Sequence, residues 1–202
     1  MPSRHIIHNR SKPLSRPRVL VLDIDHTLLH STTSPKVNGY IPSFRTYKTK
    51  LRPGVKTFLE RIRPLFTDII VWSAGERRYV DWMTKIIFDG VSYQPKLVMA
   101  REDCASSQSI EDDGSIGCTY YKPIYRVLMR PEFANSGLTM SDVVILDDSG
   151  YTFIVNSANG ILAERFSGLD NDQYLEMLAI ALEQAFSTAT PTEPLTSIIY
   201  RA

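Results

Sequence analysis

Short polar side chains stand at the ends of three almost wholly apolar runs of this sequence. They are Asp23, Asp25, Ser73, Asp147 and Asp148. Carboxylates gathered in one place repel one another, by about 4 kcal/mol for a pair roughly 4 Å apart at an effective dielectric of about 20. A divalent cation removes that repulsion, and a set of oxygen ligands without thiols or imidazoles favours Mg²⁺. The residue types therefore indicate a magnesium site, provided that the fold brings them together.

The runs that carry these residues have the composition of strands buried on both faces, as in parallel sheets. They cover residues 18–24, 68–72 and 143–146, with weaker candidates at 96–99 and 160–163. Apolar residues at helical spacing predict helices over 53–63, 76–89, 123–129 and 170–186, with Gln173 placed for a capping box in the last. Strands that alternate with helices predict a parallel α/β sheet with right-handed crossovers. Ligands bind beyond the carboxyl ends of the strands in such sheets, so the polar residues are expected to meet at one edge.

Two stretches interrupt the alternation of strands and helices. Residues 31–50 predict a small β insertion, and residues 101–121, with their acidic tip, predict an irregular hairpin. Because the chain has no internal repeat and no linker, we expect one domain over residues 18–186. A basic arm over 1–17 precedes it, and a Thr- and Pro-rich tail over 187–202 is expected to be loosely held.

The composition sets limits on the class of protein. With 202 residues, 43% of them hydrophobic and 22% charged, the chain is typical of a single globular domain. The net charge of +1 argues against a protein that coats nucleic acid. The first eighteen residues, however, contain five Lys or Arg and no acid. That arm suits either a disordered solubilising tail or a contact with nucleic-acid phosphates.

Cysteine usage and hydropathy add two expectations. Cys104 and Cys118 lack neighbours at the spacing of a zinc site and are expected to be free thiols. The N-terminus has no apolar stretch of signal-peptide length, and no run approaches the roughly 20 apolar residues of a membrane span. We therefore expect an intracellular, soluble protein without a membrane partner, with cytoplasm and nucleus both open.

The first pair of acids belongs to a longer motif. Residues 23–28, D-I-D-H-T-L, match the D-x-D-x-T motif that opens the phosphatases of the haloacid dehalogenase (HAD) superfamily. More narrowly, the chain resembles the FCP/SCP (NLI-interacting-factor-like) group, which dephosphorylates the C-terminal repeat domain (CTD) of RNA polymerase II. Further segments match in the family order, over residues 18 to 182: L-R-P-G-V at 51–55, V-W-S-A-G at 71–75, R-E-D-C at 101–104, Y-K at 121–122 and L-D-D-S at 146–149.

The resemblance implies roles for the acidic residues. Asp23 is the nucleophile that becomes an aspartyl phosphate, and Asp25 donates a proton to the leaving oxygen and then takes one from water. Mg²⁺ is held by the Asp23 carboxylate, the Asp25 backbone carbonyl and Asp148. Asp147 is either a further ligand or the holder of a bound water. An Asp rather than an Asn at position 148 favours the FCP branch over the small-phosphatase branch.

The resemblance also implies which residues bind phosphate. Ser73 and the following backbone amides, beginning with Ala74, hold its oxygens, and Lys122 bridges the phosphate and Asp23. Thr27 belongs with this group and fixes the loop after the first strand. Arg77 and Arg78, just past Ser73, suit contacts with a second phosphate of the substrate, although Arg at such a position usually marks a solvated helix face.

The resemblance implies a Rossmann-like HAD fold, with a central parallel sheet flanked by helices. The gaps between the motifs leave room for a small β insertion and no large cap domain. An open site favours a phosphate on a macromolecule, first of all phosphoserine or phosphothreonine in an extended peptide. One alternative is a phosphatase that acts on nucleic-acid ends, suggested by the basic arm and by Arg77 and Arg78. The other is a non-catalytic binding scaffold, against which the presence of both Asp23 and Asp25 argues.

Overall fold

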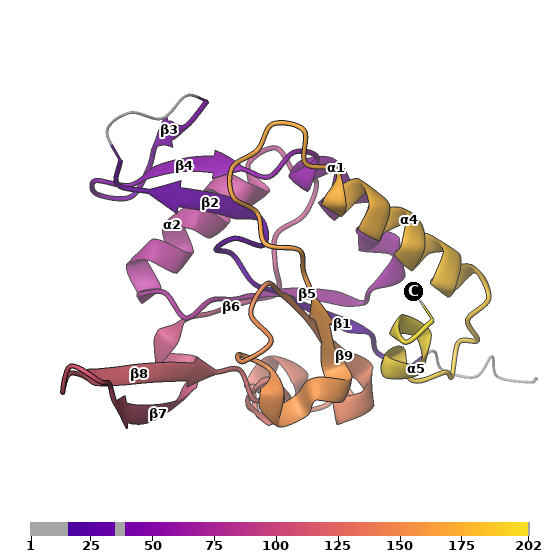
Figure 1. The fold of residues 1–202 in the computed structure, drawn as a ribbon. Helices are drawn as coiled ribbons and strands as arrows, with labels where there is room; N and C mark the ends of the chain where they lie inside the picture. The colour runs from indigo at the N-terminus through magenta and orange to yellow at the C-terminus, as the bar shows by residue number, and fades with distance from the viewer. Residues whose placement is uncertain (1–15, 35–38, 202) are drawn as a thin grey trace, which may run out of the picture.

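The computed structural model describes residues 16–34 and 39–201, and its centre is a five-stranded parallel sheet (Figure 1). The strand order is β10-β9-β1-β5-β6. The strands are β1 (Val19–Leu22), β5 (Asp68–Trp72), β6 (Leu97–Met99), β9 (Val143–Asp147) and β10 (Gly160–Leu162). Every predicted strand is present. The central strand β1 pairs with β5 and β9, which come from the other two strongly apolar runs, and Leu20 lies beside Ile69 and Val144.

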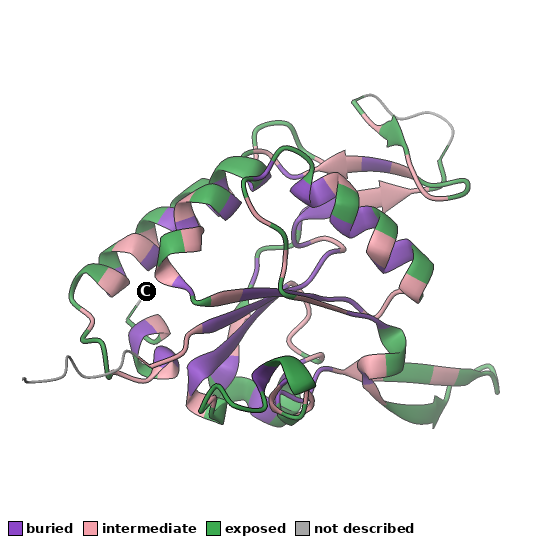
Figure 2. Cartoon of the chain, turned by 180° about the vertical axis from the view of Figure 1, so that it is seen from behind, coloured by how far each residue is buried: buried purple, intermediate pink, exposed green. Residues whose placement is uncertain are grey.

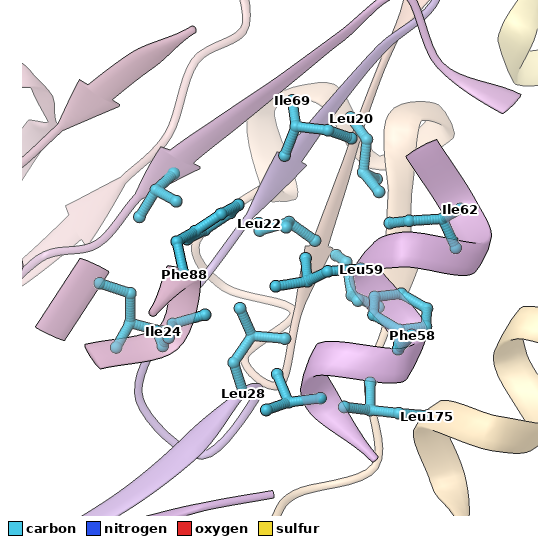
Figure 3. Close-up of a cluster of buried hydrophobic side chains, with 14 of the residues drawn as sticks. Leu20, Leu22, Ile24, Leu28, Phe58, Leu59, Ile62, Ile69, Phe88 and Leu175 are labelled. Carbon is cyan, nitrogen blue, oxygen red and sulfur yellow. The ribbon is translucent and has the colours of Figure 1, made fainter. Parts of the chain in front are cut away.

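The central strand is buried on both faces, as the apolar run predicts. Leu20 and Leu22 face one hydrophobic cluster, whereas Val19 and Val21 face a second, because side chains alternate along a strand. Figure 2 shows the buried strands between two covering layers, and Figure 3 shows Leu20 and Leu22 among side chains from the helices of the first layer. Each such side chain contributes about 1.5–3 kcal/mol by leaving water.

Three helices cover the first face: α1 (Val55–Ile62), α2 (Arg77–Phe88) and α4 (Tyr174–Ser187). Apolar residues at a spacing of three or four bury one side of α1, from Val55 to Ile62. Gly54 precedes α1 with φ of 74°, a left-handed conformation that glycine adopts at little cost. Helix α4 begins at Tyr174 rather than near residue 170, and Gln173 makes no side-chain cap. The predicted capping box is therefore wrong.

The second face is covered by less regular structure. It includes α3 (Tyr125–Leu128), which is shorter than the predicted helix over 123–129. Short 3-10 turns complete this layer and the connections, at Arg63–Leu65, Arg101–Asp103, Pro131–Phe133, Met140–Asp142 and Ile154–Asn159.

Both predicted β insertions are present. Strands β2 (Leu29–Thr32), β3 (Ile41–Pro42) and β4 (Lys48–Leu51) form an antiparallel sheet in the order β2-β4-β3. Strands β7 (Ala105–Ile110) and β8 (Ile116–Tyr121) form a hairpin that is regular, since all six residues of each strand are paired. Within the described parts of the chain, neither insertion contains a helical cap domain.

The C-terminal segment differs from the expectation of a loosely held tail. Helix α5 (Leu195–Ile199) follows α4, and its Leu195 and Ile198 side chains are completely buried. The composition of the tail is polar, yet two apolar residues at helical spacing are enough to fix it against the sheet. At the other end, the basic arm lies outside the described residues up to position 15. Across the described chain, none of the helices has both the length and the apolarity needed to span a bilayer.

Candidate active site

The carboxyl ends of β1, β5 and β9 open into a cleft of about 460 Å³. Its lining contains all five polar residues that end the apolar runs, together with Lys122: Asp23, Asp25, Ser73, Lys122, Asp147 and Asp148. The structure thus brings together side chains that are far apart in sequence. This is the edge at which open α/β sheets bind ligands.

The chain leaves strand geometry immediately after Asp23. The Asp23 amide still donates to the Leu146 carbonyl of β9 over 3.0 Å, whereas the Leu28 amide donates back to the Ile24 carbonyl over 2.9 Å. His26 has φ of 60° in this turn. The tight turn redirects Asp25, which in a continued strand would share a face with Asp23.

Thr27 fixes the nucleophile candidate. Its hydroxyl donates to Asp23 Oδ2 over 3.0 Å and accepts the Asp148 amide over 3.0 Å. The Thr27 side chain is completely buried and does not line the cleft. The structure therefore places it behind Asp23, where it positions the carboxylate, and its contact with phosphate stays a prediction.

The Arg52 side chain stabilises the same turn through hydrogen bonds to its backbone. Its guanidinium donates to the Thr27 carbonyl over 3.1 Å and to the Glu164 carbonyl over 2.8 Å. The other two nitrogens donate to both carboxylate oxygens of Asp172 over 2.8 Å. Arg52 belongs to the L-R-P-G-V motif, but the motif alone gave no reason to connect it with the catalytic turn.

Lys122 lies between two carboxylates. Its ammonium donates to Asp23 Oδ1 and to Asp147 Oδ2, each over 2.6 Å, and all three side chains are buried. Burial opposes the charge on Lys122, but Asp23 and Asp147 outweigh it and hold the pKa of the ammonium above its ordinary value. Burial and the charge of Asp147 raise the pKa of Asp23 to about 8. The shift of the Asp23 pKa is thus due first to burial, and that of the Lys122 pKa to the two neighbouring carboxylates.

The residues fit a divalent cation. Carboxylate oxygens of Asp23, Asp147 and Asp148 all lie within 4.8 Å of one another. Asp147 Oδ2 already accepts Lys122 and the Thr152 hydroxyl, and Oδ1 accepts the Ser149 amide over 2.9 Å. Asp148 uses Oδ2 for Arg165, at 2.6 Å from Nη1. A hard, all-oxygen donor set is the type that Mg²⁺ prefers.

Asp25 is the second carboxylate of the D-x-D pair. It accepts a short hydrogen bond from the Tyr79 hydroxyl, and the Ser73 hydroxyl lies 3.5 Å from its other oxygen. Burial raises the pKa of Asp25, whereas the hydrogen bond from Tyr79 lowers it. The sequence did not predict a role for Tyr79, because a Tyr on the apolar side of α2 gives no sign of where its hydroxyl points.

The segment between β5 and α2 forms one side of the cleft, where phosphate binding is predicted. Ser73, Ala74, Gly75 and Glu76 line it, and α2 begins immediately afterwards. The start of a helix is a favourable place for an anion. The Ser73 hydroxyl accepts the Gly75 amide over 3.0 Å. A Cβ at position 75 would lie 2.8 Å from the Tyr79 ring, so the close approach requires glycine.

Neither Arg77 nor Arg78 lines the cleft, and their contacts with a second phosphate of the substrate stay a prediction. Arg77 turns towards the Arg101–Asp103 turn, where it donates to Glu102 and Asp103 over 2.7 Å. The exposed side chain of Arg78 lies on the solvated face of α2. Among the residues that the structure describes, the arginines that line the cleft are Arg45 and Arg101. No spacing signal distinguished Arg45 in the sequence.

The fold and the site define a class before any relative is considered. HAD-type phosphatases share one arrangement of sheet and site. They have a parallel sheet with an Asp pair after the first strand, a Ser or Thr after a second, a buried Lys and an acidic pair after a third, and this chain has the same arrangement after β1, β5 and β9. Residues 18–190 match the model of the NLI interacting factor-like phosphatases, and the chain belongs to that family. The predicted family is thereby confirmed.

The chain is similar to several curated proteins named as phosphatases or phosphatase-like. It is 25% identical over 183 residues to phosphatase PSR1 of Saccharomyces cerevisiae, covering 85% of this chain and 37% of the relative. It is 28% identical over 180 residues to CTD small phosphatase-like protein 2 of Dictyostelium discoideum, covering 85% of this chain and 28% of the relative. The chain therefore spans less than half the length of these curated relatives.

The fold is confirmed by a solved structure. A variant of the fission yeast RNA polymerase II CTD phosphatase Fcp1, bound to beryllium fluoride, superposes with a TM-score of 0.51 at 20% identity. The match covers 85% of this chain and 51% of the Fcp1 chain. The HAD fold, with its central parallel sheet and flanking helices, is the fold of this chain.

Proposed function

We propose that this chain hydrolyses phosphoserine or phosphothreonine in protein substrates through an aspartyl phosphate on Asp23. The observation that carries the proposal is the buried Asp23 carboxylate, fixed by Thr27 and Lys122 at the floor of an open cleft beside Asp25. A nucleophile held in this way loses little freedom on reaction. Relatives that are named as phosphatases of the C-terminal domain of RNA polymerase II, which is a protein, support the substrate class.

The reaction proceeds in two displacements. An oxygen of Asp23 attacks phosphorus, the bond to the serine or threonine oxygen breaks, and Asp25 gives its proton to that oxygen. Water then attacks the phosphorus of the aspartyl phosphate and transfers a proton to Asp25, which releases phosphate and restores Asp23. Burial favours the protonated form of Asp25 that the first step requires.

Charge neutralisation makes both displacements feasible. The Lys122 ammonium lies against Asp23 and reduces the repulsion between a carboxylate and a phosphate dianion. We propose that Asp23, Asp148 and the Asp25 backbone carbonyl hold Mg²⁺, with Asp147 chiefly occupied in orienting Lys122. When bound there, Mg²⁺ supplies positive charge to the phosphoryl oxygens. Ser73 and the amides that follow it bind the remaining oxygens.

The nucleic-acid alternative loses one of its two supports. Arg77 is engaged with Glu102 and Asp103, and neither it nor Arg78 lines the cleft. The other support, the basic arm, lies outside the described residues up to position 15. Arg16, which is described, donates to Asp142 over 2.7 Å and is thus part of the domain. A peptide substrate remains the proposal.

The test is turnover of three substrates with and without Mg²⁺: p-nitrophenyl phosphate, a panel of phosphoserine and phosphothreonine peptides, and a 3′-phosphorylated oligonucleotide. We expect Mg²⁺-dependent phosphate release from the first two, and its loss in Asp23→Asn. Equal turnover by Asp23→Asn would overturn the proposed nucleophile. Preference for the oligonucleotide would overturn the proposed substrate.

A further inference from the structure

Arg45 occupies a position in the active-site cleft that the phosphoryl-transfer chemistry does not use. It stands in the turn that joins β3 to β4 and lines the same cleft as Asp23 and Asp25. Lys122, by contrast, is held by two carboxylates, and Arg101 donates to the Ala74 carbonyl over 2.8 Å. Arg45 is therefore the cleft-lining arginine that the β insertion contributes.

The turn that presents Arg45 is firmly built. The Ser43 amide donates to the Tyr47 carbonyl over 2.9 Å, and the Tyr47 amide donates to the Phe44 carbonyl over 3.0 Å. The rings of Phe44 and Tyr47 lie 5.9 and 5.7 Å from the ring of Tyr79, whose hydroxyl binds Asp25. Aromatic contacts thus fix the turn relative to the catalytic carboxylate.

The backbone at Arg45 points to a role for its side chain. Arg45 has φ of 55°, a left-handed conformation that is uncommon outside glycine. Glycine would occupy this position without strain, and strained residues of this kind cluster at functional sites. The guanidinium lies 4.9 Å from the centre of the Phe44 ring, which holds it over an apolar surface at the edge of the cleft.

The ionic partner of Arg45 is easily replaced. Arg45 Nη2 lies 3.4 Å from Glu76 Oε2, a longer separation than that of the other cleft ion pairs. Both side chains are more than half exposed, at 62% and 55%, so the pair is weak and screened. Glu76 itself lines the cleft, next to the loop that binds phosphate. A substrate anion could take the place of the Glu76 carboxylate at little cost.

We infer that Arg45 binds a second anionic group of the substrate, and that the Glu76 carboxylate pairs with Arg45 when no substrate is bound. This inference rests on the proposed function and narrows the substrate class to phosphopeptides with a further acidic group near the scissile phosphate. A carboxylate and a second phosphate share the chemistry that Arg45 recognises. The bidentate geometry of a guanidinium suits both.

The test compares kcat/KM for matched phosphopeptides. One series carries Asp at each position from three residues before to three after the phosphoserine, a second carries a second phosphoserine there, and the reference peptide is neutral. For the wild-type chain, we expect one position at which an acid raises kcat/KM by about tenfold, mainly through KM. The readout is this preference, a ratio taken within each variant, so changes in folding or overall rate cancel.

Substitutions of Arg45 and of Glu76 should change the preference for the acidic peptide in opposite directions. Arg45→Gln should abolish it, and Arg45→Gly, which suits the left-handed backbone, should do the same if the Gln variant folds poorly. Glu76→Gln frees Arg45 and should increase the preference. The matched control is Arg61→Gln, which breaks the surface pair between Arg61 and Glu183 and should leave the ratio unchanged.

The outcomes separate this inference from the proposed function. Failure to hydrolyse p-nitrophenyl phosphate or any phosphopeptide overturns both. Hydrolysis of all peptides at equal kcat/KM, or a preference that survives Arg45→Gln, overturns the role of Arg45 alone. A preference confined to the doubly phosphorylated series supports the inference and identifies phosphate, rather than carboxylate, as the second anion.

Discussion

The Nζ atom of Lys122 lies 2.6 Å from Oδ1 of Asp23, although the two residues are 99 positions apart in the chain. The contact joins the end of β1 to the segment that follows β8, and both side chains are buried. If this buried ammonium were removed, Asp23 and Asp147 would have no counter-charge.

Replacement of Lys122 by Met should retain the shape of the side chain and remove its charge. The pKa of Asp23, already raised by burial and Asp147, should rise further, which leaves less of the nucleophilic carboxylate. We expect kcat to fall by a factor on the order of 100 to 1000, as for the loss of other preorganised charges in active sites. Steady-state kinetics with p-nitrophenyl phosphate would measure the change.

The matched control is Lys96→Met. Lys96 also pairs with an acid, Asp68, over 3.0 Å, but the pair is partly exposed and lies outside the cleft. This variant should keep the kcat of the parent. Equal losses in the two variants would show that the effect of Lys122 is structural and not electrostatic.

The hydrogen bond from Tyr79 to Asp25 predicts a change in pH dependence. That bond stabilises the ionised carboxylate and lowers the pKa of Asp25, against the upward effect of burial. Tyr79→Phe removes the donor, so the pKa of Asp25 should rise. Since the proposed acid must be protonated, the alkaline limb of kcat/KM should move to higher pH.

A pH–rate profile of Tyr79→Phe beside the parent would check the direction of the shift. Tyr93→Phe is a suitable control, because Tyr93 is partly buried and its hydroxyl donates to the Leu59 carbonyl, away from the carboxylates. Its profile should match that of the parent. An alkaline limb that moved to lower pH in Tyr79→Phe would exclude Asp25 as the proton donor.

The sequence predicted the buried strands of the sheet better than the ends of the helices. The buried strands are recognisable because runs such as residues 68–72 are apolar on both faces, and their polar ends follow from the topology of a parallel sheet. The start of α4 was placed too early, at residue 170, because Asp172 accepts both Arg52 and the Tyr174 amide, so that the helix begins only at Tyr174. The contact with Arg52 spans 120 positions, and no local pattern encodes it.

The residues of the site likewise include some that the sequence predicted and some that it did not. Asp23, Asp25, Ser73, Lys122, Asp147 and Asp148 belong to ordered motifs and were predicted to meet, which they do. Tyr79 and Arg45 were not predicted, because their roles depend on where α2 and the β insertion lie relative to the cleft. Arg77 lies close to Ser73 in sequence, but that closeness did not predict that its side chain donates to Glu102 and Asp103.

Arg165 should weaken the binding of Mg²⁺. Its Nη1 atom lies 2.6 Å from Asp148 Oδ2, so it occupies one oxygen of a proposed ligand and repels a nearby cation. The Arg165 side chain is 63% exposed, and pairs of this kind contribute only about 0–1 kcal/mol. We therefore expect Arg165→Gln to lower the Kd for Mg²⁺ by up to about fivefold.

Isothermal titration with MgCl₂, or the Mg²⁺ dependence of the melting temperature, would measure this affinity without reference to turnover. Arg165→Lys keeps the charge and should bind Mg²⁺ much as the parent does. Weaker binding by the Gln variant would contradict the prediction and would mean that Arg165 holds Asp148 in its ligating orientation.

Helix α5 provides a test of whether the C-terminal segment is part of the folded domain. Leu195 is completely buried, in the cluster that includes Leu146 of β9 and Leu182 of α4. Leu195→Ala should therefore lower the free energy of unfolding by about 2–5 kcal/mol, as for other buried Leu-to-Ala changes. Tyr200→Ala, only five residues further along and at a side chain that is 93% exposed, should change it by less than about 0.5 kcal/mol. Urea unfolding of both variants would decide between a docked helix and the loosely held tail that the composition predicts, because a tail of that kind would make the two substitutions equally harmless.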